Sequence, residues 1–135
     1  MRSVTPENVN IANALPYDFG PEELDLDGWG NVDFFCKHED VLMLLEIEKG
    51  QKHPNTNVLK VWPFLNENPN QKILLIQIIR PENNAPKNRL KLCKYTGKKL
   101  EELYKGRFAY IYYNWHPDIL DELKQKIEKK LDKLK

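Results

Sequence analysis

Two short, almost entirely apolar runs constrain the fold of this chain more than any other feature of its 135 residues. The first is Val41–Glu48, which is apolar until its last residues, and the second is Ile73–Ile79. Both have the length of strands, and a continuous apolar run is typical of a strand that is covered on both faces. The segment between them predicts a helix from Pro54, which Pro63 limits or kinks. The chain therefore predicts a βαβ unit with parallel strands.

The flanking segments complete an α/β fold with a mixed central sheet flanked by helices. We expect the order helix, two or three antiparallel strands, helix, strand, helix, strand, helix, in one domain that covers residues 1–135. The expected flanking elements are a helix capped by Thr5 and stopped by Pro16, a strand at Val32–Cys36, a helix over Leu90–Tyr104, a tyrosine-rich strand at Arg107–Trp115 and an amphipathic helix from Pro117.

Composition narrows the function classes. No apolar stretch reaches the roughly 18 residues of a membrane helix, and no apolar run follows Met1 and Arg2, so we expect a cytoplasmic protein without a membrane partner. The two cysteines, Cys36 and Cys93, form no metal motif and are expected as buried thiols, and the three histidines are not at zinc-ligand spacing. Residues 1–48 hold eleven acidic residues against two basic ones, whereas the rest of the chain has a net charge of +10. This asymmetry indicates a cation site in the first part and a polyanion surface in the second.

Three carboxylates are the candidate site. Asp33 falls inside an otherwise apolar predicted strand, and Glu46 and Glu48 end the next one. Side chains two apart on a strand share a face, and pairing of the two strands could bring Asp33 beside Glu46. Converging carboxylates repel one another and resist burial unless a cation joins them, and oxygen ligands favour Mg²⁺ or Mn²⁺. The alternative is that Glu46 and Glu48 are solvated at a strand end.

The segments Gly30-Asn31-Val32-Asp33 and Leu45-Glu46-Ile47-Glu48-Lys49 resemble the core of PD-(D/E)xK nucleases, the restriction-endonuclease-like superfamily. The resemblance covers roughly residues 5–80 and implies an α-β-β-β-α-β core, here followed by a C-terminal α-β-α extension. It also implies a Mg²⁺-dependent phosphodiesterase in which Asp33 and Glu46 hold the metal with the backbone carbonyl of Ile47. Glu48 would act as general base. The alternative is a catalytically inactive nuclease-fold module that binds nucleic acid or protein.

The chain departs from this family at one position, because Glu48 stands where the family usually has lysine. Lys60 is the candidate for a lysine supplied by the following helix, where it shares a face with Asn57. Lys49 and Lys52 are weaker candidates. The additional acidic residue of the family could be Glu7, Glu22 or Glu23.

A lysine stripe is the candidate surface for nucleic acid, with DNA favoured over RNA. Its members fall at helical spacing opposite an apolar face: Lys87, Lys91, Lys94 and Lys98. Tyr110, Tyr112, Tyr113 and Trp115 could stack bases, although aromatic residues on a strand are more often packed in the core. Solvated lysines are the alternative for the stripe. The tyrosine-rich last strand could also support a homodimer.

Overall fold

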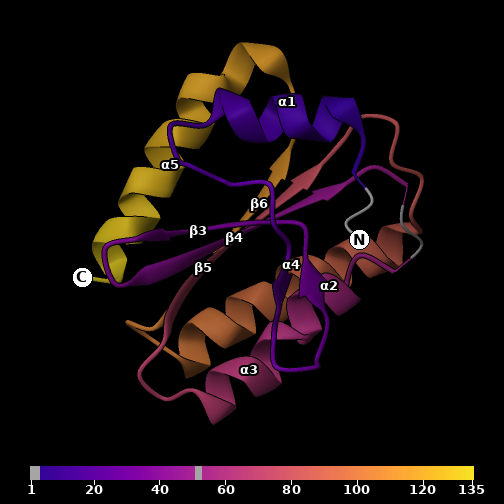
Figure 1. Ribbon diagram of the computed structural model, residues 1–135. Helices are drawn as coiled ribbons and strands as arrows, with labels where there is room; N and C mark the ends of the chain where they lie inside the picture. Colours follow the sequence, from indigo (N-terminus) through magenta and orange to yellow (C-terminus); the bar gives the residue numbers. More distant parts are fainter. Residues whose placement is uncertain (1–3, 51–52) are drawn as a thin grey trace.

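The computed structural model describes residues 4–50 and 53–135, and its centre is a four-stranded mixed sheet with helices on both faces (Figure 1). The strand order is β3-β4-β5-β6, with β3 antiparallel to β4 and the last three strands parallel. The elements are α1 (Pro6–Ala14), β1 (Leu24–Asp25), β2 (Asn31–Val32), β3 (Phe34–His38), β4 (Val41–Glu48), α2 (Thr56–Leu59), α3 (Val61–Glu67), β5 (Lys72–Ile79), α4 (Lys87–Leu103), β6 (Phe108–Asn114), the short 3₁₀ helix η1 (Pro117–Ile119) and α5 (Leu120–Lys133). The expected mixed sheet with flanking helices is therefore confirmed.

The two apolar runs form the central strands. Every residue of β4 is buried, and all of β5 is buried except Lys72 at its start. The two strands are parallel and are joined through α2 and α3, as the predicted βαβ unit requires. Burial of both faces explains why neither run alternates between apolar and polar residues.

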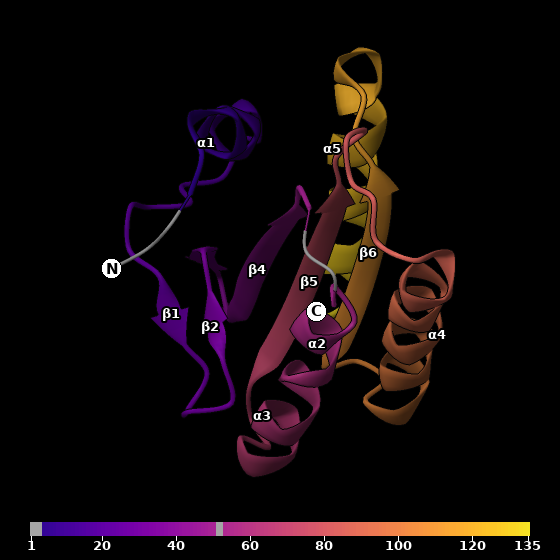
Figure 2. The ribbon, with the colours of Figure 1, turned by 90° about the vertical axis from the view of Figure 1, so that its right-hand side faces the viewer.

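Two layers of helices cover the sheet (Figure 2). One face packs against α1 and α5, with Met43, Leu45 and Ile47 pointing from β4 into that core. The other face packs against α2, α3 and α4, with Leu42 and Leu44 pointing into it. Since strand residues alternate, Glu46 and Glu48 belong to the second face. No helix in the described part of the chain is long and apolar enough to cross a membrane.

The first helix begins where the sequence predicts, whereas the helix expected from Pro117 opens with the 3₁₀ turn η1, and α5 itself begins at Leu120. The Thr5 side chain accepts a hydrogen bond from the backbone N–H of Asn8 at 3.3 Å, and Pro6 is the first helical residue of α1. In α5, the predicted apolar stripe packs on the sheet through its buried members Leu123, Ile127 and Leu131. Each helix is therefore held by one apolar face, as expected for short amphipathic helices.

One predicted strand is wrong in detail, and the kink predicted at Pro63 in the following helix is confirmed. The expected strand Val32–Cys36 is interrupted, because Asp33 lies in a bend between β2 and β3. The helix expected from Pro54 is divided into α2 and α3 at Lys60. Pro63 explains the division, since it has no N–H to donate to the carbonyl of Leu59 and its ring crowds that carbonyl.

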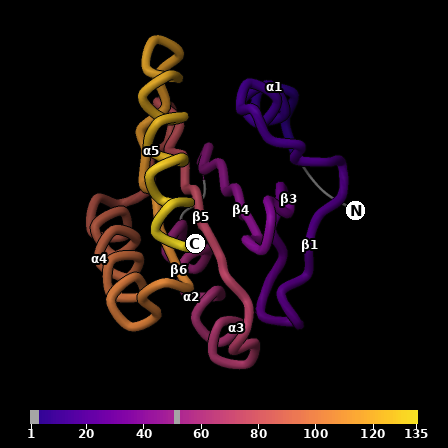
Figure 3. Tube along the Cα trace, turned by 90° about the vertical axis from the view of Figure 1, so that its left-hand side faces the viewer, coloured from indigo at the N-terminus to yellow at the C-terminus, as the bar shows by residue number. Residues whose placement is uncertain are grey.

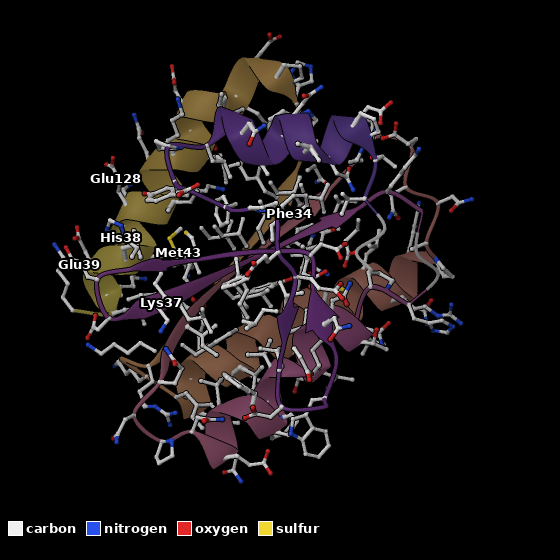
Figure 4. All side chains as sticks on the ribbon, in the orientation of Figure 1. Phe34, Lys37, His38, Glu39, Met43 and Glu128 are labelled. Carbon is white, nitrogen blue, oxygen red and sulfur yellow. The ribbon has the colours of Figure 1, made fainter. Side chains whose placement is uncertain are left out.

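The β3–β4 hairpin turns beside the C-terminal half of α5 (Figure 4). Glu39 adopts a positive φ of 57° in the tight connection that the sequence predicts here. The His38 ring contacts the edge of the Tyr17 ring, with centroids 5.5 Å apart. Glu128 of α5 and the hairpin residues line one shallow hollow. The hairpin is thus packed against α5 and against the segment that follows α1.

Candidate functional site

Two glutamates at the end of β4 form the centre of the candidate site. Glu46 is 6% exposed and Glu48 is 0% exposed, so both carboxyl groups are removed from water. They point toward α2, whereas the side chain of Ile47 between them is buried in the opposite core. The alternative of a solvated strand end is therefore wrong. Burying two carboxyl groups is costly unless each is hydrogen-bonded or neutralised.

Lys60 contacts Glu46 from the junction of α2 and α3. Its ammonium group donates to Glu46 Oε1 at 2.9 Å, to the Asn31 carbonyl at 2.6 Å and to Asn57 Oδ1 at 2.9 Å. Its three donors are therefore matched by three acceptors. Gly30 leaves room for the lysine stem, since a Cβ there would lie 2.9 Å from Lys60 Cδ, and its φ is +149°. Lys60, the lysine that the sequence suggested for this site, therefore lies beside Glu46, and Asn57 shares its side of the helix.

Amide groups hold Glu48. Asn57 Nδ2 donates to both Glu48 oxygens, at 3.0 and 2.9 Å, and Gln77 Nε2 donates to Glu48 Oε2 at 2.7 Å. Gln77 Nε2 also donates to the Pro54 carbonyl at 3.1 Å, and the Tyr110 hydroxyl donates to Gln77 Oε1. One hydrogen-bonded network thus runs from Lys60 on the helix layer to Tyr110 on β6. It fixes the orientation of the Glu48 carboxyl group.

Burial dominates the electrostatics of the two glutamates. It raises the pKa of Glu46 to about 8, and the charges of Glu48 and Asp33 act in the same direction while Lys60 opposes them. Burial also raises the pKa of Glu48, against the hydrogen bonds from Asn57 and Gln77 that lower it. Loss of hydration penalises the charged form of each carboxyl group. Near neutral pH the site is therefore able to hold or release a proton.

Asp33 lies near these acids from the bend between β2 and β3. Phe34 pairs with Leu45 at the end of the β3–β4 ladder, so the bend at Asp33 lies next to the part of β4 that carries Glu46. Its charge raises the pKa of both glutamates. Within residues 4–50 and 53–135, however, no cluster of three or more Asp, Glu, His or Cys side chains is arranged to hold a metal ion.

The weaker candidates lie elsewhere. Lys49 is exposed, and its charge contributes to the lowered pKa of Glu7. Glu7 lies on α1, at the opposite face of the sheet from Glu46. Glu22 is exposed and Glu23 half-buried in the segment before β1. Lys52 lies outside the described residues.

The lysine stripe is exposed along α4, as expected: Lys87, Lys91, Lys94 and Lys98. The last three line a groove of about 1150 Å³ between α4, α5 and β6. The predicted stacking residues are less available, since Tyr110 and Tyr113 are buried. The half-buried ring of Tyr112 lies under the Lys94 ammonium group, 4.6 Å from the ring centroid.

Gln77 is the site residue that sequence reasoning missed. The signal was present, because a glutamine in the middle of the most apolar strand needs hydrogen-bond partners. Its hydrogen-bond partner, Glu48, could not be identified from the sequence. The register of β4 on β5 pairs Gln77 with Glu46, and this register brings Gln77 within reach of Glu48. Tyr110 was considered for stacking, and its hydrogen bond to Gln77 was not expected.

Comparison of the chain with models of known protein families, with curated proteins and with solved structures finds no match. The function is therefore inferred from the geometry and chemistry of the site.

Proposed function

We propose that this protein is a small metal-dependent nuclease that hydrolyses phosphodiester bonds, with DNA favoured over RNA. The observation that carries the proposal is the buried Glu46–Lys60 pair, with Asp33 beside it and Glu48 behind it on the same strand face. The chain order supports the proposal in part: α1, the antiparallel pair β3–β4, α2–α3 and the parallel strand β5 occur in the order of the restriction-endonuclease-like core, whereas β1 and β2 form a separate two-stranded sheet.

The residues fit a divalent cation in their chemistry. The Lys60 contact uses Glu46 Oε1; the other carboxylate oxygen of Glu46, the Asp33 side chain and the Ile47 carbonyl would hold the ion. Such an all-oxygen set suits Mg²⁺ or Mn²⁺. When bound, either ion would supply Lewis-acid polarisation of the scissile phosphate and a more acidic water.

The chain's own side chains would complete the site. The Lys60 ammonium group, held by Asn31 and Asn57, would stabilise negative charge on the phosphate oxygens as the bond breaks. The Glu48 carboxylate, oriented by Asn57 and Gln77, would accept the proton of the attacking water. Burial raises the pKa of Glu48, which makes its carboxylate a stronger base than an exposed one.

A second candidate is a nuclease-fold module that binds without cleaving. It is favoured by the internal satisfaction of the network, since amide groups already bond both Glu48 oxygens. In that case the network would be a structural device of the core.

Calorimetry and cleavage assays test the proposal. We expect Mn²⁺ to bind, with binding removed by Asp33→Ala, and divalent-dependent cleavage that is lost in Glu46→Ala. The substrate panel contains single-stranded, duplex and branched DNA, and RNA. Glu128→Ala, which removes an exposed carboxylate on α5, is the matched control and should retain both properties. Absence of Mn²⁺ binding, even with nucleic acid present, would refute the metal site; binding without cleavage of any substrate would favour the module.

A further inference from the structure

The outer edge of β6 has a backbone that no strand of the described sheet covers. Residues with odd numbers face β5, since the Trp115 N–H donates to the Ile79 carbonyl and the Arg107 carbonyl accepts from Ile73, both at 2.8 Å. Alternate residues of a parallel strand point their N–H and C=O to the same side. The backbones of Tyr110, Tyr112 and Asn114 therefore point outward. The Tyr110 N–H is already bonded to Glu101 Oε2 at 2.9 Å, which closes one end of the edge.

Two helices turn this edge into a groove. Both α4 and α5 pack against β6, and the tube view shows them on either side of the sheet at that end (Figure 3). The groove has a volume of about 1150 Å³. Two large apolar side chains on its α4 wall are exposed, Leu92 by 45% and Tyr95 by 63%. The groove thus offers backbone hydrogen-bonding groups and an apolar wall together.

The groove is also basic. Five lysines and two glutamates line it: Lys91, Lys94, Lys98, Lys126, Lys130, Glu101 and Glu122. Lys130 is paired with Glu101, and Lys126 lies 3.9 Å from Glu122. No carboxylate in the described residues forms an ion pair with Lys91, Lys94 or Lys98. The α4 wall therefore has a net positive charge that an acidic ligand would neutralise.

We infer that this groove binds an extended acidic segment of a partner protein, which adds to β6 as a fifth strand. The outward N–H and C=O groups of Tyr112 and Asn114 would pair with the segment's backbone, as in other cases of strand addition. Its acidic side chains would meet Lys91, Lys94 and Lys98, and its apolar side chains would pack on Leu92 and Tyr95. This inference is independent of the proposed nuclease activity.

The charge pattern decides between possible occupants. In a two-fold pairing of β6 with a second copy, the α4 helices of both copies would lie on the same face, so their lysines would repel one another. A nucleic acid would place phosphates against the outward carbonyls of β6 and would gain no open face on Tyr112, which Lys94 covers. An acidic strand meets neither objection.

The test uses a fluorescein-labelled peptide of about ten residues in which Glu alternates with Val and Thr, a pattern suited to a strand. We expect micromolar binding by fluorescence anisotropy, with chemical-shift changes in the amide signals of Tyr112 and Asn114. Replacement of both Lys94 and Lys98 by Glu should weaken binding by about tenfold or more. The same variant should gain binding to a matched peptide that carries Lys in place of Glu. The matched control replaces Lys129 and Lys133, two exposed lysines of α5 outside the groove, and should bind the acidic peptide normally.

Four results would overturn the inference. The first is absence of peptide binding, and the second is undiminished binding by the Lys94→Glu/Lys98→Glu variant. The third is equal binding of a peptide with Pro at alternate positions, which cannot pair as a strand, because this would leave charge as the sole cause. The fourth is a different occupant: a dimer of the wild-type chain in sedimentation that fills the groove, or tighter binding of an oligothymidylate at the same amides.

Discussion

Loss of the proton from Glu46 should make this protein less stable as the pH rises. Burial raises the pKa of Glu46 to about 8 in the folded chain, from an ordinary value of 4.5. Between these two values the folded chain keeps a proton that the unfolded chain has lost. The free energy of unfolding therefore falls by about 1.4 kcal/mol per pH unit from this group, or at most about 5 kcal/mol over the window. The contribution is fully present below pH 4.5 and is lost as the pH rises through about 8.

Glu46→Gln should remove this dependence. Glutamine has the shape of a protonated glutamate, and its amide oxygen can still accept the hydrogen bond from Lys60. We expect the variant to be within about 1 kcal/mol of the wild type near pH 5 and several kcal/mol more stable than it near pH 8. Glu48 also has a raised pKa, and its charge raises the pKa of Glu46, so the comparison measures the pH dependence of this coupled pair of carboxyl groups.

Urea unfolding followed by circular dichroism, at intervals of pH between about 5 and 8.5, measures the difference. Glu128→Gln is the matched control, because it removes an exposed carboxylate from α5 and should follow the wild type at every pH. Parallel pH profiles for the wild type and Glu46→Gln would refute the reasoning, since they would mean that Glu46 is ionised in the folded protein throughout the range.

Two further substitutions test the packing around the site. Gly97→Ala should destabilise the protein by about 1–3 kcal/mol in urea unfolding, because an added Cβ would clash with the Tyr110 ring. The control Gly20→Ala, with no atom within 4 Å of its added Cβ, should be nearly neutral. Equal costs for the two variants would contradict the close packing of α4 on β6. Tyr110→Phe should cost about 1–2 kcal/mol in the same measurement, because it leaves the buried Gln77 Oε1 without its donor, and a cost near zero would show that this hydrogen bond contributes nothing.

The central strands and the terminal helices could be predicted because their signals are local. A strand buried on both faces is mainly apolar, as β4 is from Val41 to Leu45 and β5 is apart from Lys72 and Gln77, and α5 carries one apolar stripe at helical spacing. The cap at Thr5 follows from the chemistry of a single side chain and the next helical turn. None of these features depends on which residue from a distant part of the sequence packs against it.

The details of the site depend on contacts that local patterns do not encode. Asp33 reads as part of a strand, yet the chain bends there between two separate sheets. The convergence of Glu48, Gln77 and Tyr110 requires β5 to pair with β4 and β6 in one particular register. A shift of one residue would turn Gln77 toward the opposite core. A polar residue such as Gln77 in an apolar strand indicates that it has hydrogen-bond partners. The tertiary structure is needed to identify those partners.

The charges at the site explain why a structural network and a metal site can look alike. Asp33, Glu46 and Glu48 would carry three negative charges if all were ionised, and Lys60 forms an ion pair with one of them, Glu46. A buried net charge is costly, so a proton or a further cation must offset it. A raised pKa on Glu46 is what the proton alternative requires. A divalent ion bound to the same carboxylate would have to displace that proton, because metal ligation needs the deprotonated form. The proton and the proposed metal therefore compete for Glu46. The pH dependence of stability measures the free energy needed to remove that proton in the folded protein, which metal binding would have to supply.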